Sequence, residues 1–283
     1  QELGAMEIDI QLEDDNLGEK QDVASSRALF ERRAQTADQA LAILNIYVPE
    51  KKGMLDSLAG KPLVEKELFE KAAENQDQYM ATASRIVTLD KQIAESKAAV
   101  LKVQNQVEAL APWLSLTVPV SYTGTQKTAV LIGTMPNPQD QQSILNLLAG
   151  AVPDVEAVDV ELISTDKDFT YLAVICMKQD AGKVEEVLRT GGFSKPSSPV
   201  QKIPEEYKKD LEAEIAKAQE QVKQLESELA ECAVSRQDLE LISDYYRTRA
   251  EKYRILGEIP QTASTFAISG YVPAAKADAI VKE

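Results

Sequence analysis

The chain has 283 residues and a formal net charge of −15, and only 5% of its residues are aromatic although 44% are hydrophobic. Few large rings among many Ala, Glu, Lys, Leu and Gln residues are typical of long helices and unusual in a compact enzyme. The acidic balance disfavours nucleic acids and anionic lipid surfaces as partners, because both carry negative charge. A basic protein partner would suit this charge, although acidity also keeps an elongated protein soluble.

The first elements expected along the chain are a strand and a helix. Residues 5–11 alternate apolar and polar side chains, which predicts a half-buried strand. A helix is predicted over about 23–48, before Pro49, and a short helix within 50–60. The apolar stripe expected on the longer helix comprises Leu29, Ala37, Leu41, Leu44 and Val48.

Two long helices are predicted, at about 63–111 and 204–256. The first stops before Pro112, and the second starts at Pro204, a residue that suits the first turn of a helix. In each helix apolar residues recur every three or four positions, as in the seam of a coiled coil. The first seam is Tyr79, Ala83, Ile86, Leu89, Ile93, Ser96, Val100, Val103, Val107 and Leu110. The second is Tyr207, Leu211, Ile215, Ala218, Val222, Leu225, Leu229, Cys232, Leu239, Ile242, Tyr246, Tyr253 and Leu256.

The section between the long helices has a different pattern, with short strands and short helices. The expected elements are a strand at 128–134, a helix from Pro138, strands at 158–162 and 169–177, and a helix from Asp180 to Gly191-Gly192. A final strand lies either before Pro196 or at 116–122. This order resembles a ferredoxin-like split βαβ lobe. After the second long helix, a strand at 265–272 and a helix from Pro273 complete the chain.

We therefore predict an α+β fold, in which a long antiparallel two-helix coiled coil carries a small α/β lobe at each end. Neither long helix can expose its seam to water, so one chain satisfies both by folding back on itself. The predicted parts are a proximal lobe (1–62 with 258–283), a coiled-coil rod (63–112 with 204–257) and a distal ferredoxin-like lobe (113–203). A strand from each end of the chain would join one proximal sheet. Two separate homodimeric coiled coils are the alternative.

Residues for catalysis are scarce in this sequence. It contains no His, which excludes His-based acid–base and nucleophilic mechanisms and most zinc sites. Cys176 and Cys232 are expected to be reduced, buried small hydrophobes, which is consistent with a cytosolic compartment. No apolar run is long enough to span a bilayer. We predict no enzyme activity, no catalytic residues, no cofactor and no metal.

Three other features of the sequence have both a functional and a structural interpretation. The loop from Gly133 to Gln141 lies between a strand and a helix, but it has one glycine and no lysine, so we interpret it as a helix start and not as a phosphate loop. Acidic pairs such as Asp14-Asp15 and Glu185-Glu186 are interpreted as solvated surface. The tyrosines and arginines near the end of the second long helix form either a partner-binding surface or the end of the seam, and we favour the seam. They are Tyr245, Tyr246, Arg247, Arg249, Tyr253 and Arg254.

Four stretches carry a resemblance to a known family. They are LGAMEI at Leu3–Ile8, ALAPWLSLTVPV at Ala109–Val120, FSKPSSPVQKIPEEYKKDLEAEI at Phe193–Ile215 and TFAISGYVPAAKADAI at Thr265–Ile280. In this order and spacing they resemble the cytoplasmic N-terminal domain of subunit I of bacterial and archaeal V-type (A/V-type) ATPases, the counterpart of eukaryotic subunit a. The resemblance covers essentially the whole chain.

The resemblance implies a non-catalytic stator arm of a rotary proton- or sodium-translocating ATPase. Such an arm links the membrane sector to the peripheral stalks and resists the torque of the rotor. The implied partners are the E and G proteins of the peripheral stalks at both lobes, the C protein of the central stalk near the proximal lobe, and the parent protein's own membrane domain. The implied location is the cytoplasmic side of the cell membrane, in a multi-pass parent protein. The family's first strand and helix would precede Gln1, so we expect a truncated proximal lobe.

Two other classes of function are compatible with parts of the pattern. A ferredoxin-like lobe on a coiled-coil scaffold could bind a small regulatory ligand, which would require a polar pocket within 127–192. A chaperone-like or chromosome-organising coiled coil would show a nucleotide-binding head or exposed apolar tips, and the sequence has no such head.

Overall fold

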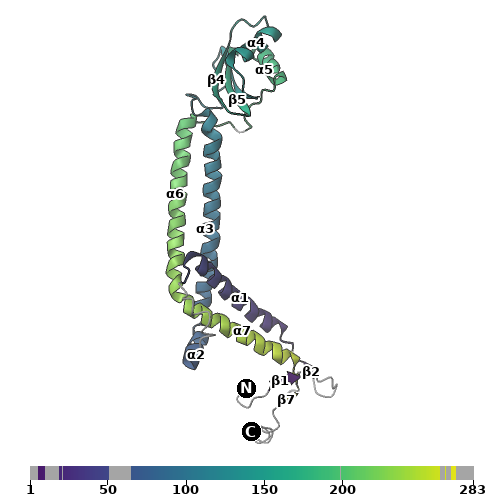
Figure 1. The fold of residues 1–283 in the computed structure, drawn as a ribbon, viewed down its shortest axis with the longest axis vertical. Helices are drawn as coiled ribbons and strands as arrows, with labels where there is room; N and C mark the ends of the chain where they lie inside the picture. Colours follow the sequence, from purple (N-terminus) through teal and green to yellow (C-terminus); the bar gives the residue numbers. More distant parts are fainter. Residues whose placement is uncertain are drawn as a thin grey trace. The chain divides into compact units, whose positions relative to one another are not determined.

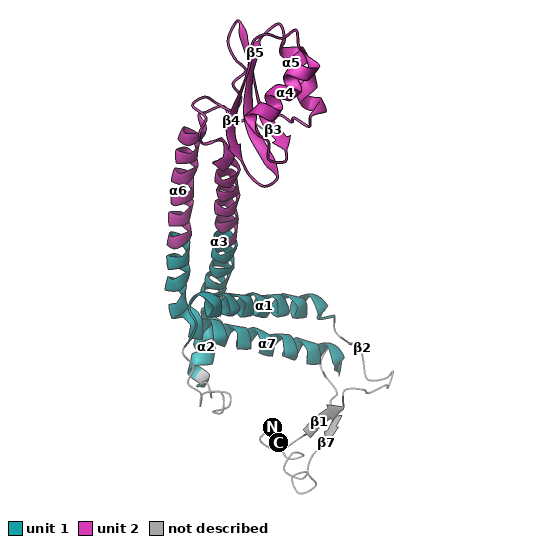
Figure 2. Cartoon of the chain, turned by 45° about the horizontal axis from the view of Figure 1, so that its top comes forward, with its two compact units in different colours: residues 1–93, 224–283 teal, residues 94–223 magenta. Residues whose placement is uncertain are grey.

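The structure is a computed structural model that describes residues 6–9, 19–20, 22–50, 65–197, 199–261, 265 and 269–271. The chain divides into two compact units, Gln1–Ile93 with Gln224–Glu283 and Ala94–Lys223 (Figure 2). The helices α3 (Gln76–Leu110) and α6 (Pro204–Glu231) each continue from one unit into the other. The three-part division given above stays a prediction. The predicted short helix within 50–60 and the helix from Pro273 lie outside the described residues.

The first unit is built around two helices that lie side by side, α1 (Ala24–Tyr47) and α7 (Arg236–Glu258) (Figure 1). The shorter helix α2 (Lys66–Glu74) also packs against α7. Two short antiparallel pairs join the two ends of the chain: β1 (Met6–Asp9) with β7 (Ser269–Tyr271), and β2 (Glu19–Lys20) with β6 (Pro260–Gln261). The prediction that a strand from each end would join one sheet is therefore confirmed.

Residues of the two long helices contact each other in both units. In the first unit, Arg85 of α3 forms an ion pair with Glu228 of α6 at 2.9 Å. In the second, Val103 and Leu110 of α3 share a hydrophobic cluster with Leu211 of α6. All ten predicted seam positions of the first long helix are buried or half-buried. The two helices thus run in opposite directions with their apolar stripes facing each other.

The second unit contains a three-stranded antiparallel sheet of order β3-β5-β4. Its elements in chain order are β3 (Thr128–Pro136), α4 (Gln141–Ala151), β4 (Val158–Thr165), β5 (Phe169–Met177) and α5 (Ala181–Thr190). The order β3-β5-β4 within the sheet is the order that a split βαβ arrangement gives to its first three strands. A fourth strand is reduced to one antiparallel bridge between Thr134 and Ser194, which supports the predicted position before Pro196 over that at 116–122.

Both faces of this sheet are covered. Helices α4 and α5 cover one face, where Leu131 of β3, Leu172 of β5 and Ile144 of α4 belong to one buried cluster. The segment after α3 covers part of the other face: Trp113, in the 3-10 turn Ala111–Trp113, clusters with Ile132 and Ala173. Its ring meets that of Tyr171 edge-on at 5.1 Å. The covering segment thus buries sheet surface that would otherwise face water.

Three sequence predictions about the helices are wrong in detail. The first long helix is interrupted at Asn75, between α2 and α3. The second is interrupted by a 3-10 turn, Cys232–Ser235, after which α7 packs against α1. In α1 the predicted stripe residue Leu29 is 43% exposed, and the buried stripe is Ala34, Ala37, Ala40, Ile43 and Leu44. Ala37 and Leu44 of the predicted stripe are buried as expected, whereas Ala34, Ala40 and Ile43, which complete the stripe, were not predicted.

Gly133 gives a test of the packing of the second unit. A Cβ at this position would lie 2.5 Å from the ring of Phe193 and 2.4 Å from the carbonyl oxygen of Ser194. We expect Gly133→Ala to lower the free energy of unfolding by about 1–3 kcal/mol, because overpacking forces the neighbouring groups to move. Urea unfolding followed by circular dichroism measures this.

The matched control is Gly150→Ala in α4, where a Cβ would meet nothing within 4 Å. It should raise stability by about 0.5–1 kcal/mol, since alanine is favoured over glycine inside a helix. Equal effects of the two substitutions would contradict the packing described for β3.

Candidate functional site

The α1–α7 interface of the first unit carries the largest group of buried polar contacts among the described residues. Small side chains, including Ala37 and Ala40 of α1 and Ser243 of α7, are buried there. Such residues let two helix backbones approach closely. Polar groups between the helices are consequently shielded from water and need protein partners.

Arg236, the first residue of α7, is the most notable of these groups. It is only 6% exposed. Its guanidinium donates hydrogen bonds to the backbone oxygens of Val48 (2.5 Å) and Leu44 (3.4 Å) and to the side-chain oxygen of Asn45, and it pairs with Glu50 at 3.3 Å. The last carbonyls of a helix have no partner within the helix, and a cation is favoured beside them. Arg236 therefore caps the end of α1 and fixes the start of α7.

Sequence reasoning did not single out Arg236, although a signal was present. The seam of the second long helix has no apolar residue between Cys232 and Leu239, where its spacing requires one. Arg236 stands in this gap. A missing seam residue combined with a cation indicates a break in the helix and a polar contact at that point.

A second polar group links α1, α7 and the start of α3. Asp38 accepts hydrogen bonds from the hydroxyl of Ser243 (2.6 Å) and from the guanidinium of Arg247 (2.7 Å). Arg33 donates to the hydroxyl of Tyr246 at 2.9 Å, and this hydroxyl donates to the side-chain oxygen of Gln76 at 3.1 Å. Every described buried side-chain polar atom has a hydrogen-bond partner.

The tyrosines near the end of α7 face the interior. Tyr245 and Tyr246 are buried, with ring centroids 5.3 Å apart. Phe30 of α1 contacts Tyr246 and Tyr253, and Phe69 of α2 contacts Tyr245. Tyr245 and Tyr246 are therefore core residues of the first unit, and Tyr253 is half-buried. The seam interpretation expected Tyr246 and Tyr253 to pack against the first long helix, whereas both rings contact Phe30 of α1. The arginines among them have partners on the same unit: Arg247 pairs with Asp38, Arg249 donates to the Tyr245 hydroxyl, and Arg254 pairs with Glu251 and Glu258.

The loop before α4 is a helix start, but the helix begins at Gln141 and not at Pro138. Asp140 is its N-cap residue, and its carboxylate accepts a hydrogen bond from the backbone N–H of Ser143 at 2.7 Å. These bonds with Ser143 lower the pKa of Asp140. Because a carboxylate already occupies this helix terminus, it opposes phosphate binding there. At α5, Asp180 is again the N-cap residue, but its side chain makes no capping bond.

Both cysteines are free thiols. Cys176 is buried in the sheet core, and Cys232 is half-buried and donates to the backbone oxygen of Glu228 at 3.4 Å. Burial raises the pKa of each thiol, so neither is an activated nucleophile. Within the described ranges, no group of three or more Cys, Asp or Glu side chains could hold a metal ion. No described helix is long and apolar enough to cross a membrane.

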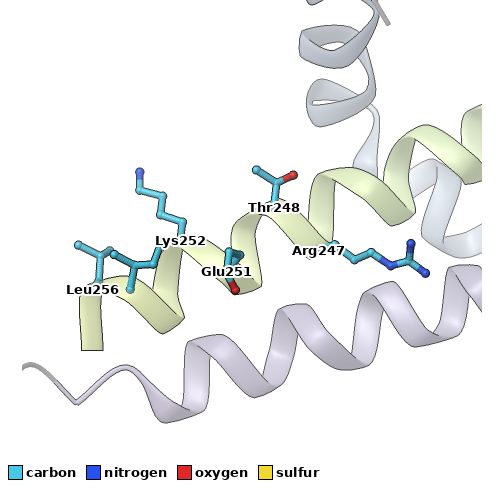
Figure 3. Close-up of a pocket in the computed structure, with 6 residues that line it drawn as sticks. Arg247, Thr248, Glu251, Lys252 and Leu256 are labelled. Carbon is cyan, nitrogen blue, oxygen red and sulfur yellow. The ribbon is translucent and has the colours of Figure 1, made fainter. Parts of the chain in front are cut away.

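Three hollows lie on the surface of the described residues. One of them, of about 580 Å³, is lined by residues of α5 alone, among them Glu185, Glu186 and Arg189. The other two lie one in each unit. The first, of about 560 Å³, is lined by residues of α7 alone, including Thr248, Glu251 and Leu256 (Figure 3). The second, of about 200 Å³, lies between α4 and the start of β4. In the described part of the chain none of the three encloses converging polar groups as a small-molecule site does, because the two larger hollows each lie along a single helix. The covered sheet and these open hollows disfavour the regulatory ligand-binding alternative.

No known family profile matches the chain, and no curated protein matches its sequence. A solved structure does match: the crystal structure of the cytoplasmic N-terminal domain of subunit I, homolog of subunit a, of V-ATPase. The match covers 100% of this chain and 90% of that chain, with a TM-score of 0.53 and 16% sequence identity. The chain has the fold of that domain. At the level of the fold, this likeness confirms the resemblance stated from the sequence.

Replacing Arg236 tests its capping role. Arg236→Ala should lower the free energy of unfolding of the first unit by about 3–5 kcal/mol, because the carbonyls at the end of α1 lose their buried partner. Urea unfolding and hydrogen exchange of residues 44–50 measure the loss. The matched control is Arg247→Ala, whose side chain is 60% exposed and pairs with Asp38. It should cost at most about 1 kcal/mol. Similar losses for the two variants would show that Arg236 has no special role.

Tyr246 predicts a dependence of stability on alkaline pH. Burial raises its pKa above the ordinary value, opposed more weakly by the hydrogen bond from Arg33. A raised pKa in the folded state means that Tyr246 contributes its full stability below about pH 10, and that this stability is lost as the pH rises further. Tyr246→Phe should therefore flatten the fall in unfolding free energy above about pH 10. Unfolding titrations at several pH values give both slopes, and identical slopes would refute the assignment.

Proposed function

We propose that the chain is a non-catalytic stator arm of a rotary V-type ATPase, linking the membrane sector to the peripheral stalks and resisting the torque of the rotor. The observation that supports this most strongly is the likeness of fold to the subunit I domain over the full length of the chain. The four sequence stretches that resemble the same family support it independently. A stator needs stiffness and contact surfaces, and it needs no catalytic residues.

The architecture suits this role in physical terms. We propose that α3 and α6 pack as an antiparallel coiled coil, and that the lobe at 113–203 is ferredoxin-like. Paired long helices resist bending better than loops do, because each helix carries its own hydrogen-bonded backbone and buries its stripe against the other. The small lobes then offer surfaces at which other subunits can bind.

The proposed partners follow from the family resemblance. They are the E and G proteins of the peripheral stalks at both lobes, the C protein of the central stalk near the proximal lobe, and the membrane domain of the parent protein. In this proposal the parent protein is a multi-pass membrane protein, and the chain lies on the cytoplasmic side.

A pull-down with the stalk proteins tests this function. The chain, immobilised through a tag, should retain a purified E–G pair, and a chain without residues 123–195 should lose one of the two contacts while its long helices remain folded by circular dichroism. An unrelated antiparallel helical hairpin of similar net charge is the control for nonspecific retention. No retention of the E–G pair by the intact chain, or full retention after the deletion, would contradict the proposal.

A further inference from the structure

The three-stranded sheet of the second unit has two edges, and another backbone segment of the chain pairs with one of them. At the β3 edge, Thr134 and Ser194 exchange two backbone hydrogen bonds, each of 2.9 Å. The other edge belongs to β4, which among the described strands pairs with β5 alone. An edge strand presents backbone N–H and C=O groups that can bind a strand of another molecule. The β4 edge is therefore the place where this sheet could be extended.

Val160 lies within β4, and both of its backbone groups are already bound. Its N–H donates to the carboxylate of Asp159 at 2.9 Å, and its C=O accepts from the side-chain amide of Gln141 at 2.6 Å. Neither partner belongs to β5. In an antiparallel pair the two backbone groups of a residue point to the same side, so those of Val160 point away from β5, toward the edge. Side chains of the chain itself thus occupy the groups that an added strand would need.

The two side chains that bind Val160 come from opposite faces of the sheet. Val160 is fully buried in the cluster beneath α4, and Gln141 is the first residue of that helix. Successive residues of a strand point to opposite faces, so Asp159 lies on the face away from α4. An added strand would have to displace both side chains at once.

The far half of β4 is interrupted in a different way. Its pairing with β5 shifts between Leu162 and Ser164, so that Ile163 is an extra residue in the strand. The hydroxyl of Ser115 donates to the C=O of Ile163 at 3.1 Å, and the hydroxyl of Ser164 donates to the C=O of Pro112 at 2.8 Å. Bulges and covering loops both break the regular row of backbone groups at a sheet edge. Pairing of an added strand beyond Leu162 is therefore disfavoured.

Stability alone does not account for both bonds of Val160. The bond from Gln141 also ties α4 to the sheet, so it would be useful in any packed lobe. Asp159, in contrast, is exposed and binds the next residue of its own strand, so its bond joins no two elements of the fold. The bond of Asp159 does occupy an N–H at the edge, which a role in preventing strand addition explains.

We infer that Gln141 and Asp159 keep the β4 edge from pairing with a strand of a second molecule of this chain. These two residues are named here the β4 guard. The inference goes beyond the stator role and does not rest on it, because a sheet edge without such a guard promotes association in any protein.

Removing both guard side chains from the intact chain tests the inference. The double variant Gln141→Ala with Asp159→Ala should associate at a concentration at least about tenfold lower than the parent chain, as measured by sedimentation velocity over a concentration series. The amides of Val158 and Leu162 point to the same side as that of Val160. Hydrogen exchange at these two amides should therefore slow when the double variant associates.

Matched variants separate the hydrogen bond from the charge. Gln141→Ala with Asp159→Asn removes the charge but keeps an acceptor for the N–H of Val160, so it should associate less than the double alanine variant. Gln141→Ala with Glu161→Ala removes a carboxylate that is also exposed, and it leaves the bond from Val160 to Asp159 in place. This variant should behave like Gln141→Ala alone. Association equal to that of the double alanine variant in either control would show that charge alone is responsible, and it would overturn the inference.

A measurement on the monomer covers the case in which the double variant melts at a lower temperature than the parent chain. Asp159→Ala alone should speed hydrogen exchange at the amide of Val160 at least about tenfold, because this N–H loses its acceptor. Unchanged exchange at Val160 would contradict the inference. So would a folded double variant that remains as monomeric as the parent chain, or association that leaves exchange at Val158 and Leu162 unchanged.

Discussion

The organisation of the first unit depends on one constraint, that a helix with a single apolar stripe must bury that stripe to remain folded. The apolar seam predicted for the second long helix packs against two different helices of the chain. Its first part, on α6, faces α3, where Leu211 clusters with Val103 and Leu110. Its second part, on α7, faces α1, where Leu239, Ile242 and Tyr246 are buried. The 3-10 turn Cys232–Ser235 between them lets the chain change partner without exposing either part.

Arg236 makes this change of partner specific. A turn alone would leave the direction of α7 free, since apolar contacts are not directional. The guanidinium binds the backbone oxygen of Val48, which follows the last residue of α1, and shares the backbone oxygen of Leu44 with the N–H of Val48. The alanines of α1 then allow α7 to approach closely, and this closeness partly shields the hydrogen bonds from Ser243 to Asp38 and from Arg33 to Tyr246. Apolar burial provides most of the stability here, and the buried polar groups determine the register.

The sequence predicts most elements of this fold, and it fails where the answer depends on contacts between distant segments. Periodicity located α1, β5 and the seam of α3 to within a few residues, because burial on one face leaves a local pattern. It did not reveal that α7 packs on α1, because Leu239 and Tyr246 leave the same apolar pattern in the sequence whether they are buried against α1 or against α3. It named Ala37 and Leu44 of the buried stripe of α1 but missed Ala34 and Ala40, because these residues are small rather than strongly apolar. In the second unit, the covering of the second sheet face was not predicted, because the position of Trp113 depends on how the chain leaves α3.

The same reasoning explains why the functional evidence lies on surfaces. In the described part of the chain the buried side-chain polar atoms all have hydrogen-bond partners, both cysteines are free thiols, and the terminus of α4 is occupied by Asp140. Within the described residues these polar groups serve to join elements of the fold, as Arg236 joins the start of α7 to the end of α1.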